Sequence, residues 1–146
     1  MFAGSLIKAK MYYYKRRGLK IGKNCHIGPN VFIDPSHRHL ISIGNETTLS
    51  PNVMIFAHDA STKRYIGYTK IGKVSIGNKC FIGAGTIILP GVKIGDNVII
   101  GAGSLVTKDI NSNCVAVGRP ADYLCSLEEF KAKHCNNQKN NIEYVE

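Results

Sequence analysis

His58 is the residue of this sequence whose position is best suited to chemistry. It stands in the segment IFAHDA, just before a polar and basic stretch, residues 61–75 (STKRYIGYTKIGKVS), that differs from the rest of the chain. An imidazole titrates near neutral pH, so it can take a proton from a hydroxyl group as that group attacks an electrophile. The alternative is a surface histidine without a role. The polar stretch beside His58 favours the general base.

Three polar residues that precede His58 are candidates for binding a substrate beside it: Asp34, Asn30 and Asn52. Asp34 stands where the neighbouring segments usually carry glycine, so its carboxylate has a reason to be tolerated. That carboxylate could bind substrate hydroxyls or orient the imidazole. Asn30 and Asn52 occupy the same place in their segments as His58 does in its own. For both asparagines, a simple role as turn residues is at least as well supported.

A six-residue period determines how these side chains are positioned. From residue 76 to residue 111 the sequence reads IGNKCF, IGAGTI, ILPGVK, IGDNVI, IGAGSL and VTKDIN, and each unit opens with an aliphatic residue. A period of six fits neither a helix nor a long two-sided strand. It fits short strands that turn a corner every few residues, with the opening residue pointing inwards. Three units then form one triangular coil of a solenoid.

The same count extends towards the N-terminus. A first coil (IGKNCH, IGPNVF, IDPSHR) covers residues 21–38, and a second (IGNETT, LSPNVM, IFAHDA) covers residues 43–60, with a four-residue bulge or small loop between them. Two units place a polar residue, His37 or Asp59, at the fifth, inward position. Local violations of this kind mark a functional site or the start of a loop. The loop 61–75 is ejected after the second coil, where a solenoid usually carries its binding face.

Segments without the repeat flank the solenoid. Residues 1–20 have the composition of a short helical cap, which Gly18 would end. The β-helix domain is predicted over residues 21–121, since Pro120 ends the strand pattern. Residues 122–146 are predicted to form a C-terminal helix and tail, with the helical pattern running from Ala121 to His134.

These units resemble the hexapeptide-repeat acyltransferases, among them the maltose, galactoside and streptogramin O-acetyltransferases and the small acetyltransferases of surface-polysaccharide synthesis. The resemblance implies an all-β fold, a left-handed parallel β-helix of about four coils, although parallel crossovers are normally right-handed. It also implies a homotrimer with active sites between subunits and acetyl-CoA as the acyl donor. Members of the family carry their catalytic histidine at the junction where His58 stands, so His58 would be the general base.

By the same resemblance, the donor site lies on the units IGAGTI and IGAGSL and the residues after them. The residues that match coenzyme A positions, or that could meet its phosphates, are Phe81, Ala84, Gly85, Ala102, Gly103, Thr107, Lys108 and Arg119. Gly85 and Gly103 would leave backbone amides open to the cofactor arm, although a corner with positive φ would also require glycine. The first explanation is favoured at Gly103. Residues 118–121 (GRPA) resemble the terminal Gly-x-Pro-Ala motif, but Asp122 follows where relatives carry basic residues.

Composition limits the partners and the compartment. The net charge is +9, and Lys8, Lys10, Lys15, Arg16, Arg17 and Lys20 lie in the first 20 residues without an acidic residue. No nucleic-acid-binding motif accompanies this charge, so a polyanionic cofactor such as coenzyme A is a sufficient partner. A weak peripheral association with an anionic membrane is a further possibility. Five cysteines without a CxxC motif, and no apolar spanning or signal segment, favour reduced structural thiols in a cytoplasmic protein.

The sequence therefore predicts an acetyl-CoA-dependent O-acetyltransferase that acts on a hydroxyl of a sugar or polysaccharide precursor. Two alternatives remain. One is an N-acetyltransferase of the same fold that acts on an amino sugar, and the other is a non-catalytic or metal-binding β-helix protein. Zinc-binding carbonic anhydrases of this fold hold their metal with two histidines five residues apart and a third from elsewhere. No such pair occurs here, so no metal is expected.

Overall fold

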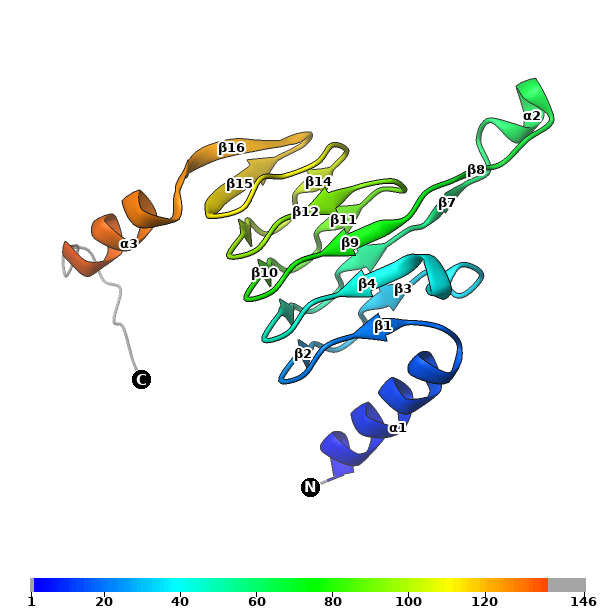
Figure 1. Ribbon diagram of the computed structural model, residues 1–146, viewed down its shortest axis with the longest axis horizontal. Helices are drawn as coiled ribbons and strands as arrows, with labels where there is room; N and C mark the ends of the chain where they lie inside the picture. Colours follow the sequence, from blue (N-terminus) through cyan, green and yellow to red (C-terminus); the bar gives the residue numbers. More distant parts are fainter. Residues whose placement is uncertain (1, 137–146) are drawn as a thin grey trace.

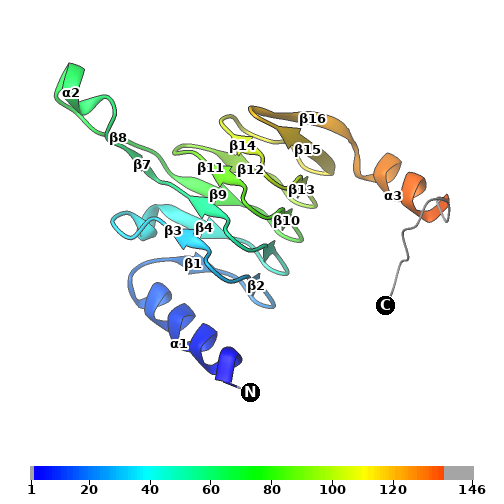
Figure 2. The same cartoon turned by 180° about the vertical axis from the view of Figure 1, so that it is seen from behind.

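The computed structural model describes the backbone of residues 2–136 and the side chains of residues 9–135. Its short strands stack into three sheets that form the faces of a left-handed β-helix with four coils (Figure 1, and from behind in Figure 2). Sheet A contains β1 (Lys20–Ile21), β4 (Ile41–Ile43), β9 (Val74–Ile76) and β12 (Lys93–Ile94). Sheet C contains β3 (Phe32–Ile33), β6 (Met54–Ile55), β11 (Ile87–Ile88) and β14 (Leu105–Val106).

Sheet B is the longest of the three faces. It contains β2 (His26–Ile27), β5 (Thr48–Leu49), β10 (Phe81–Ile82), β13 (Ile99–Ile100), β15 (Cys114–Gly118) and β16 (Ala121–Ser126). Every strand pair between coils is parallel, and only the final β15–β16 pair in this sheet is antiparallel. The chain visits A, B and C in turn, so each coil has an A–B, a B–C and a C–A edge.

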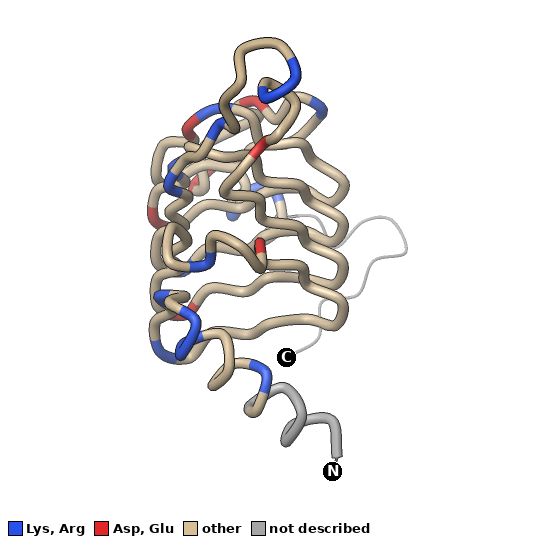
Figure 3. The backbone as a smooth tube through the Cα atoms, turned by 90° about the vertical axis from the view of Figure 1, so that its right-hand side faces the viewer, with Lys and Arg blue, Asp and Glu red and all other residues tan. Residues whose placement is uncertain are grey.

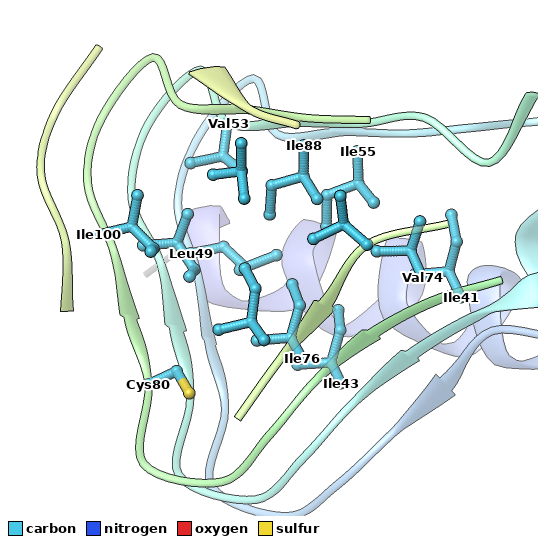
Figure 4. Close-up of a cluster of buried hydrophobic side chains, with 14 of the residues drawn as sticks. Ile41, Ile43, Leu49, Val53, Ile55, Val74, Ile76, Cys80, Ile88 and Ile100 are labelled. Atoms are coloured by element: carbon cyan, nitrogen blue, oxygen red, sulfur yellow. The ribbon is translucent and has the colours of Figure 1, made fainter. Parts of the chain in front are cut away.

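The aliphatic openers of the units fill the interior, as predicted. Figure 4 shows these side chains pointing from all three faces towards a common axis. Ile33, Ile55 and Ile88, which stack along sheet C, expose 0–1% of their surface. Burial of one such side chain stabilises the fold by roughly 1.5–3 kcal/mol. Because each coil repeats the same inward positions, the hydrophobic core is a continuous column through all four coils.

The B–C edge is a column of left-handed residues. Asn30, Asn52, Gly85 and Gly103 occupy equivalent corner positions in successive coils, with φ of +56°, +61°, +69° and +70°. Asparagine and glycine are the residues that adopt this conformation most readily. In the second, third and fourth coils, the amide of this corner donates to a carbonyl of the coil before it: Asn52 to Pro29 at 3.1 Å, Gly85 to Pro51 at 3.0 Å and Gly103 to Ala84 at 2.8 Å.

The ejected loop is an ordered arm at the C–A edge. Strands β7 (His58–Asp59) and β8 (Lys70–Ile71) pair antiparallel, and α2 (Lys63–Ile66) forms the tip of the arm. The arm projects well beyond the coils (Figure 1), and Figure 3 shows lysine and arginine on it and on the N-terminal helix. The coil resumes at the fully buried Val74, two residues before the predicted opener Ile76, because β9 begins there.

The interruption between the first two coils is likewise a regular element. A 3-10 helix, η1 (Arg38–Leu40), occupies the first half of the predicted four-residue bulge, residues 39–42, at the C–A edge. Strand β4 then begins at Ile41, which is fully buried, so the second coil starts two residues earlier than the repeat count predicts.

Both ends of the solenoid are capped. Helix α1 (Phe2–Arg16) covers the first coil, buries Tyr14 against it, and is followed by Gly18 at φ +95°. The C-terminal prediction is wrong in one respect, because residues 121–126 form strand β16 and α3 (Leu127–Asn136) begins only afterwards. Strand β15 has a free edge that offers backbone hydrogen bonds, and this pairing overrides the local helical composition. Within residues 2–136, no helix is long and apolar enough to cross a membrane.

Helix α3 starts where its capping residues place it. Ser126 Oγ accepts a hydrogen bond from the Glu129 amide at 3.1 Å, and Glu129 Oε2 accepts one from the Ser126 amide at 2.7 Å. This reciprocal pair is a capping box, which satisfies two backbone donors at a helix N-terminus. The helix therefore cannot extend back to Ala121 without losing both the box and the β15–β16 pairing.

Candidate active site

Asp34 and His58 form a hydrogen-bonded pair at the C–A edge. Asp34 follows β3 and is fully buried, whereas His58 opens the arm and its side chain is 33% exposed. Asp34 Oδ2 lies 2.5 Å from His58 Nδ1 and 3.0 Å from the Ala57 amide nitrogen. Asp34 Oδ1 accepts a third hydrogen bond from the Ser36 amide at 3.0 Å. Both carboxylate oxygens are therefore occupied by groups of the protein.

This arrangement selects the tautomer of His58. Burial by itself raises the pKa of the Asp34 carboxyl, but the hydrogen bonds from His58, Ala57 and Ser36 outweigh that effect and hold the pKa below its ordinary value of 3.8. An ionised carboxylate can only accept hydrogen bonds, so Nδ1 of His58 carries the proton. The lone pair is then on Nε2, the nitrogen directed away from Asp34, which is the form required of a general base.

A second histidine lies against this pair. The ring of His37 is 4.9 Å from the His58 ring, centroid to centroid, and His37 Nδ1 is 3.9 Å from Asp34 Oδ2. His37 Nδ1 is buried and has no hydrogen-bond partner. In the sequence, His37 stood out because it is a polar residue at the fifth, inward position of its unit. That position did not indicate which groups His37 would contact.

Of the three candidates for substrate binding, only Asp34 lies beside His58. Asn30 and Asn52 are exposed corner residues on the B–C edge, at the opposite side of sheet C. Their positive φ supports the turn role that the sequence left open. The expectation that they flank His58 is therefore wrong within one chain, because they belong to the second unit of each coil and His58 to the third.

The residues assigned to the donor gather mainly at the B–C edge. Ala84 and Ala102 are exposed there beside the two glycines, and Arg119 Nη1 donates to the Gly103 carbonyl at 3.4 Å from the β15–β16 turn. Phe81 is 48% exposed on the outward face of sheet B. Two residues lie apart, since Thr107 and Lys108 follow β14 towards the C–A edge. Lys108 Nζ pairs there with Asp122 Oδ1 at 3.1 Å.

Two expectations for the donor glycines need correction. The amides of Gly85 and Gly103 are not open to a ligand, because each already donates to the preceding coil. Both glycines also adopt positive φ, so the corner itself favours glycine or asparagine at these positions. A Cβ added at either residue would nevertheless meet no atom within 4 Å, and would point into open space.

We predict that Gly103→Asn separates these two roles. Asparagine tolerates the left-handed corner, as Asn30 and Asn52 do, so the variant should lose less than about 1 kcal/mol of stability, whereas Gly103→Ala should lose about 1–2 kcal/mol. If coenzyme A crosses this edge, the added side chain should raise the KM for acetyl-CoA several-fold at a nearly unchanged Tm. Gly67→Asn, at φ +79° in the arm, is the matched control. A wild-type KM in Gly103→Asn would remove the donor from this edge.

A left-handed parallel β-helix built of hexapeptide units is the fold of the hexapeptide acyltransferase class, and this chain carries a hydrogen-bonded Asp–His pair on one edge of it. Residues 73–108 match the family described as "Bacterial transferase hexapeptide (six repeats)", and residues 18–57 match "Hexapeptide repeat of succinyl-transferase". The chain is 39% identical to Protein CapG of Staphylococcus aureus over 130 residues, which cover 84% of this chain and 74% of CapG. It is 44% identical to the galactoside O-acetyltransferase of Lactococcus lactis over 111 residues, covering 68% and 51% of the two chains.

Solved structures agree with these matches. A galactoside acetyltransferase in complex with coenzyme A superposes with a TM-score of 0.66 at 27% identity, covering 96% of this chain and 79% of that one. A maltose O-acetyltransferase from Clostridium difficile 630 gives 0.60 at 32% identity, with 77% and 72% covered. The chain belongs to the hexapeptide-repeat acyltransferase family, as its repeat predicted. It spans 64%, 63% and 51% of the next three relatives.

Proposed function

We propose that this protein transfers an acetyl group from acetyl-CoA to a hydroxyl group of a sugar or saccharide. The observation that carries the proposal is the Asp34–His58 pair, which leaves Nε2 of a partly exposed imidazole free to accept a proton. The similarity to a galactoside acetyltransferase solved with coenzyme A supports the donor. The similarity to galactoside and maltose O-acetyltransferases supports the acceptor class.

In this mechanism His58 moves one proton. Its Nε2 takes the proton of the acceptor hydroxyl as the oxygen attacks the thioester carbonyl, and the imidazolium that forms is held by Asp34. The tetrahedral intermediate then expels the coenzyme A thiolate, to which His58 returns the proton. The products are an acetyl ester and coenzyme A, and His58 is again neutral. Asp34 acts only through His58, since its own oxygens are occupied.

The outward face of sheet C supports assembly into a homotrimer. It carries an apolar stripe, formed by the successive register partners Phe32, Met54, Ile87 and Leu105. Phe32 and Met54 each expose 39% of their surface. The matching positions on sheet A are the polar residues Lys20, Ser42, Ser75 and Lys93. Three chains that direct their stripes to a threefold axis would cover this apolar surface.

Such a trimer would also complete the site. Around a threefold axis that sheet C faces, the C–A edge of each chain lies next to the B–C edge of its neighbour. His58 would then face the neighbour's Gly85 and Gly103 corner, although the two edges are separated by sheet C within one chain. This geometry supports active sites shared between subunits, and it gives Asn30 and Asn52 a place near His58 of the adjacent chain.

Met54→Glu should dissociate the trimer. Met54 is central in the apolar stripe, and three unpaired carboxylates buried around the axis would each cost several kcal/mol. We expect wild type to sediment as a trimer and Met54→Glu as a folded monomer at micromolar concentration. Lys20→Glu, on the polar face of sheet A, is the control and should remain trimeric. Trimeric Met54→Glu would contradict the use of this face.

The acceptor chemistry is tested with paired sugars. Each pair carries a hydroxyl or an amino group at the same carbon, and mass spectrometry locates the acetyl group after incubation with acetyl-CoA. Transfer to the hydroxyl member supports the proposal, and transfer to the amino member alone would replace it by N-acetylation.

All five cysteines are free, which is typical of a reducing compartment, and we place the reaction in the cytoplasm.

A further inference from the structure

Asp34, His37 and His58 present three metal-ligating atoms to one another. These atoms all lie within 4.8 Å, although the three residues come from two different coils. Asp34 is fully buried, and both histidines are partly buried. His37 Nδ1 is a buried nitrogen without a hydrogen-bond partner, and it faces the Asp34 carboxylate that His58 also contacts. The mechanism proposed above leaves His37 without a role.

The geometry is near that of a zinc site. Zinc binds imidazole nitrogen and carboxylate oxygen at about 2.0–2.2 Å, so a tetrahedral ion holds its ligand atoms about 3.3 Å apart. Here Asp34 Oδ2 is 2.5 Å from His58 Nδ1 and 3.9 Å from His37 Nδ1. Lengthening the first distance and shortening the second by less than about 1 Å each would bring both to the separation expected in a tetrahedral site. Two imidazoles and a carboxylate also suit zinc better than magnesium or calcium, which prefer oxygen ligands.

We propose that Asp34, His37 and His58 bind a zinc ion that reversibly inhibits the enzyme. The inhibitory effect rests on the proposed function, because it assumes that His58 is the base. Zinc binds the lone pair of an imidazole nitrogen, so it can bind Nδ1 of His58 only when that nitrogen no longer carries the proton that it now donates to Asp34. The single N–H proton of the neutral ring therefore moves from Nδ1 to Nε2 when zinc binds, and His58 has no lone pair left with which to accept the proton of the acceptor. The sequence did not reveal this site because 21 residues separate His37 from His58.

The test measures zinc binding and activity separately. All proteins carry Cys135→Ser, since this exposed thiol would itself bind zinc. Isothermal titration with Zn²⁺ compares the parent protein with His37→Gln and with His39→Gln, whose ring is 6.1 Å from that of His37 and which is outside the cluster. We expect one ion per chain in the parent, an affinity at least about 10-fold lower in His37→Gln, and no change in His39→Gln.

Acetyl transfer is followed by mass spectrometry of the product, because zinc binds the thiol of coenzyme A. Each rate is expressed relative to the same protein without zinc. The rates of the parent and of His39→Gln should fall over the same range of zinc concentration as the site fills, and EDTA should restore both rates. His37→Gln should need at least about 10-fold more zinc for the same inhibition. Equal zinc affinity in His37→Gln and the parent, or no binding in the parent, would overturn the site. Binding that depends on His37 but leaves the rate unchanged would keep the site and overturn His58 as the base.

Discussion

His58→Ala is expected to lower the rate of acetyl transfer by roughly 10²-fold or more, which is the usual contribution of a positioned general base. The side chain is 33% exposed and makes one hydrogen bond, to Asp34, so its loss should change the Tm little. The KM for acetyl-CoA should remain close to wild type, since His58 is not among the residues proposed to bind the donor.

The control for this variant is His39→Ala. His39 belongs to the 3-10 helix on the same C–A edge and is exposed. Its ring is 6.1 Å from that of His37, and it is outside the cluster of Asp34, His37 and His58. It should retain the wild-type rate. Steady-state kinetics at saturating acetyl-CoA, with sedimentation and thermal unfolding of each variant, provides the comparison. Near-wild-type turnover in a folded His58→Ala trimer would exclude His58 from the chemical step.

Asp34→Asn should lower the rate by about 10²–10⁴-fold, although Asp34 does not touch the substrate. The amide group of asparagine can donate to Nδ1 of His58, and this favours the tautomer that carries its proton on Nε2. Such a ring cannot accept the acceptor's proton. The lower rate should therefore appear as a lower kcat, with the KM for acetyl-CoA unchanged. A general loss of structure would be expected to change both, so the two effects can be separated.

The same variant should also be less stable, by about 1–3 kcal/mol, because the buried carboxylate accepts hydrogen bonds from Ser36, Ala57 and His58 and an amide cannot satisfy all three. The pKa of Asp34 is lowered by folding, so its ionised form stabilises the native state above the ordinary value of 3.8. That contribution is lost as the pH falls through the lower folded-state pKa. Asp34→Asn should therefore be destabilised at neutral pH, and by less at strongly acidic pH.

Asp59→Asn is the matched control for Asp34→Asn. Asp59 is adjacent to His58 in the chain, and its carboxylate accepts the Ser61 amide at 2.8 Å rather than the imidazole. The substitution changes a neighbouring charge without changing the tautomer, so the rate should stay within a few-fold of wild type. If Asp59→Asn and Asp34→Asn reduce kcat equally, loss of negative charge near the site, and not the tautomer of His58, explains the result.

The sequence by itself determined the β-helix and most of its core. The six-residue period repeats one local geometry, so the inward openers, the corner residues and the position of the arm follow from counting units. The same count could have separated Asn52 from His58, since the second and third units of a coil end at different edges. A left-handed corner at residues 85 and 103 was one of the two explanations that the sequence left open for these glycines.

Only the tertiary structure decided which groups meet at the site. Asp34 and His58 are 24 residues apart, and their hydrogen bond joins the residue after β3 in one coil to the first residue of the arm that leaves the next coil. The role of the Asp34 carboxylate was therefore open until its burial and its three donors were known. Likewise, residues 121–126 have a helical composition, but the free edge of β15 pairs with them as a strand. Local pattern specifies which side chains face inwards, whereas contacts between coils decide their chemistry.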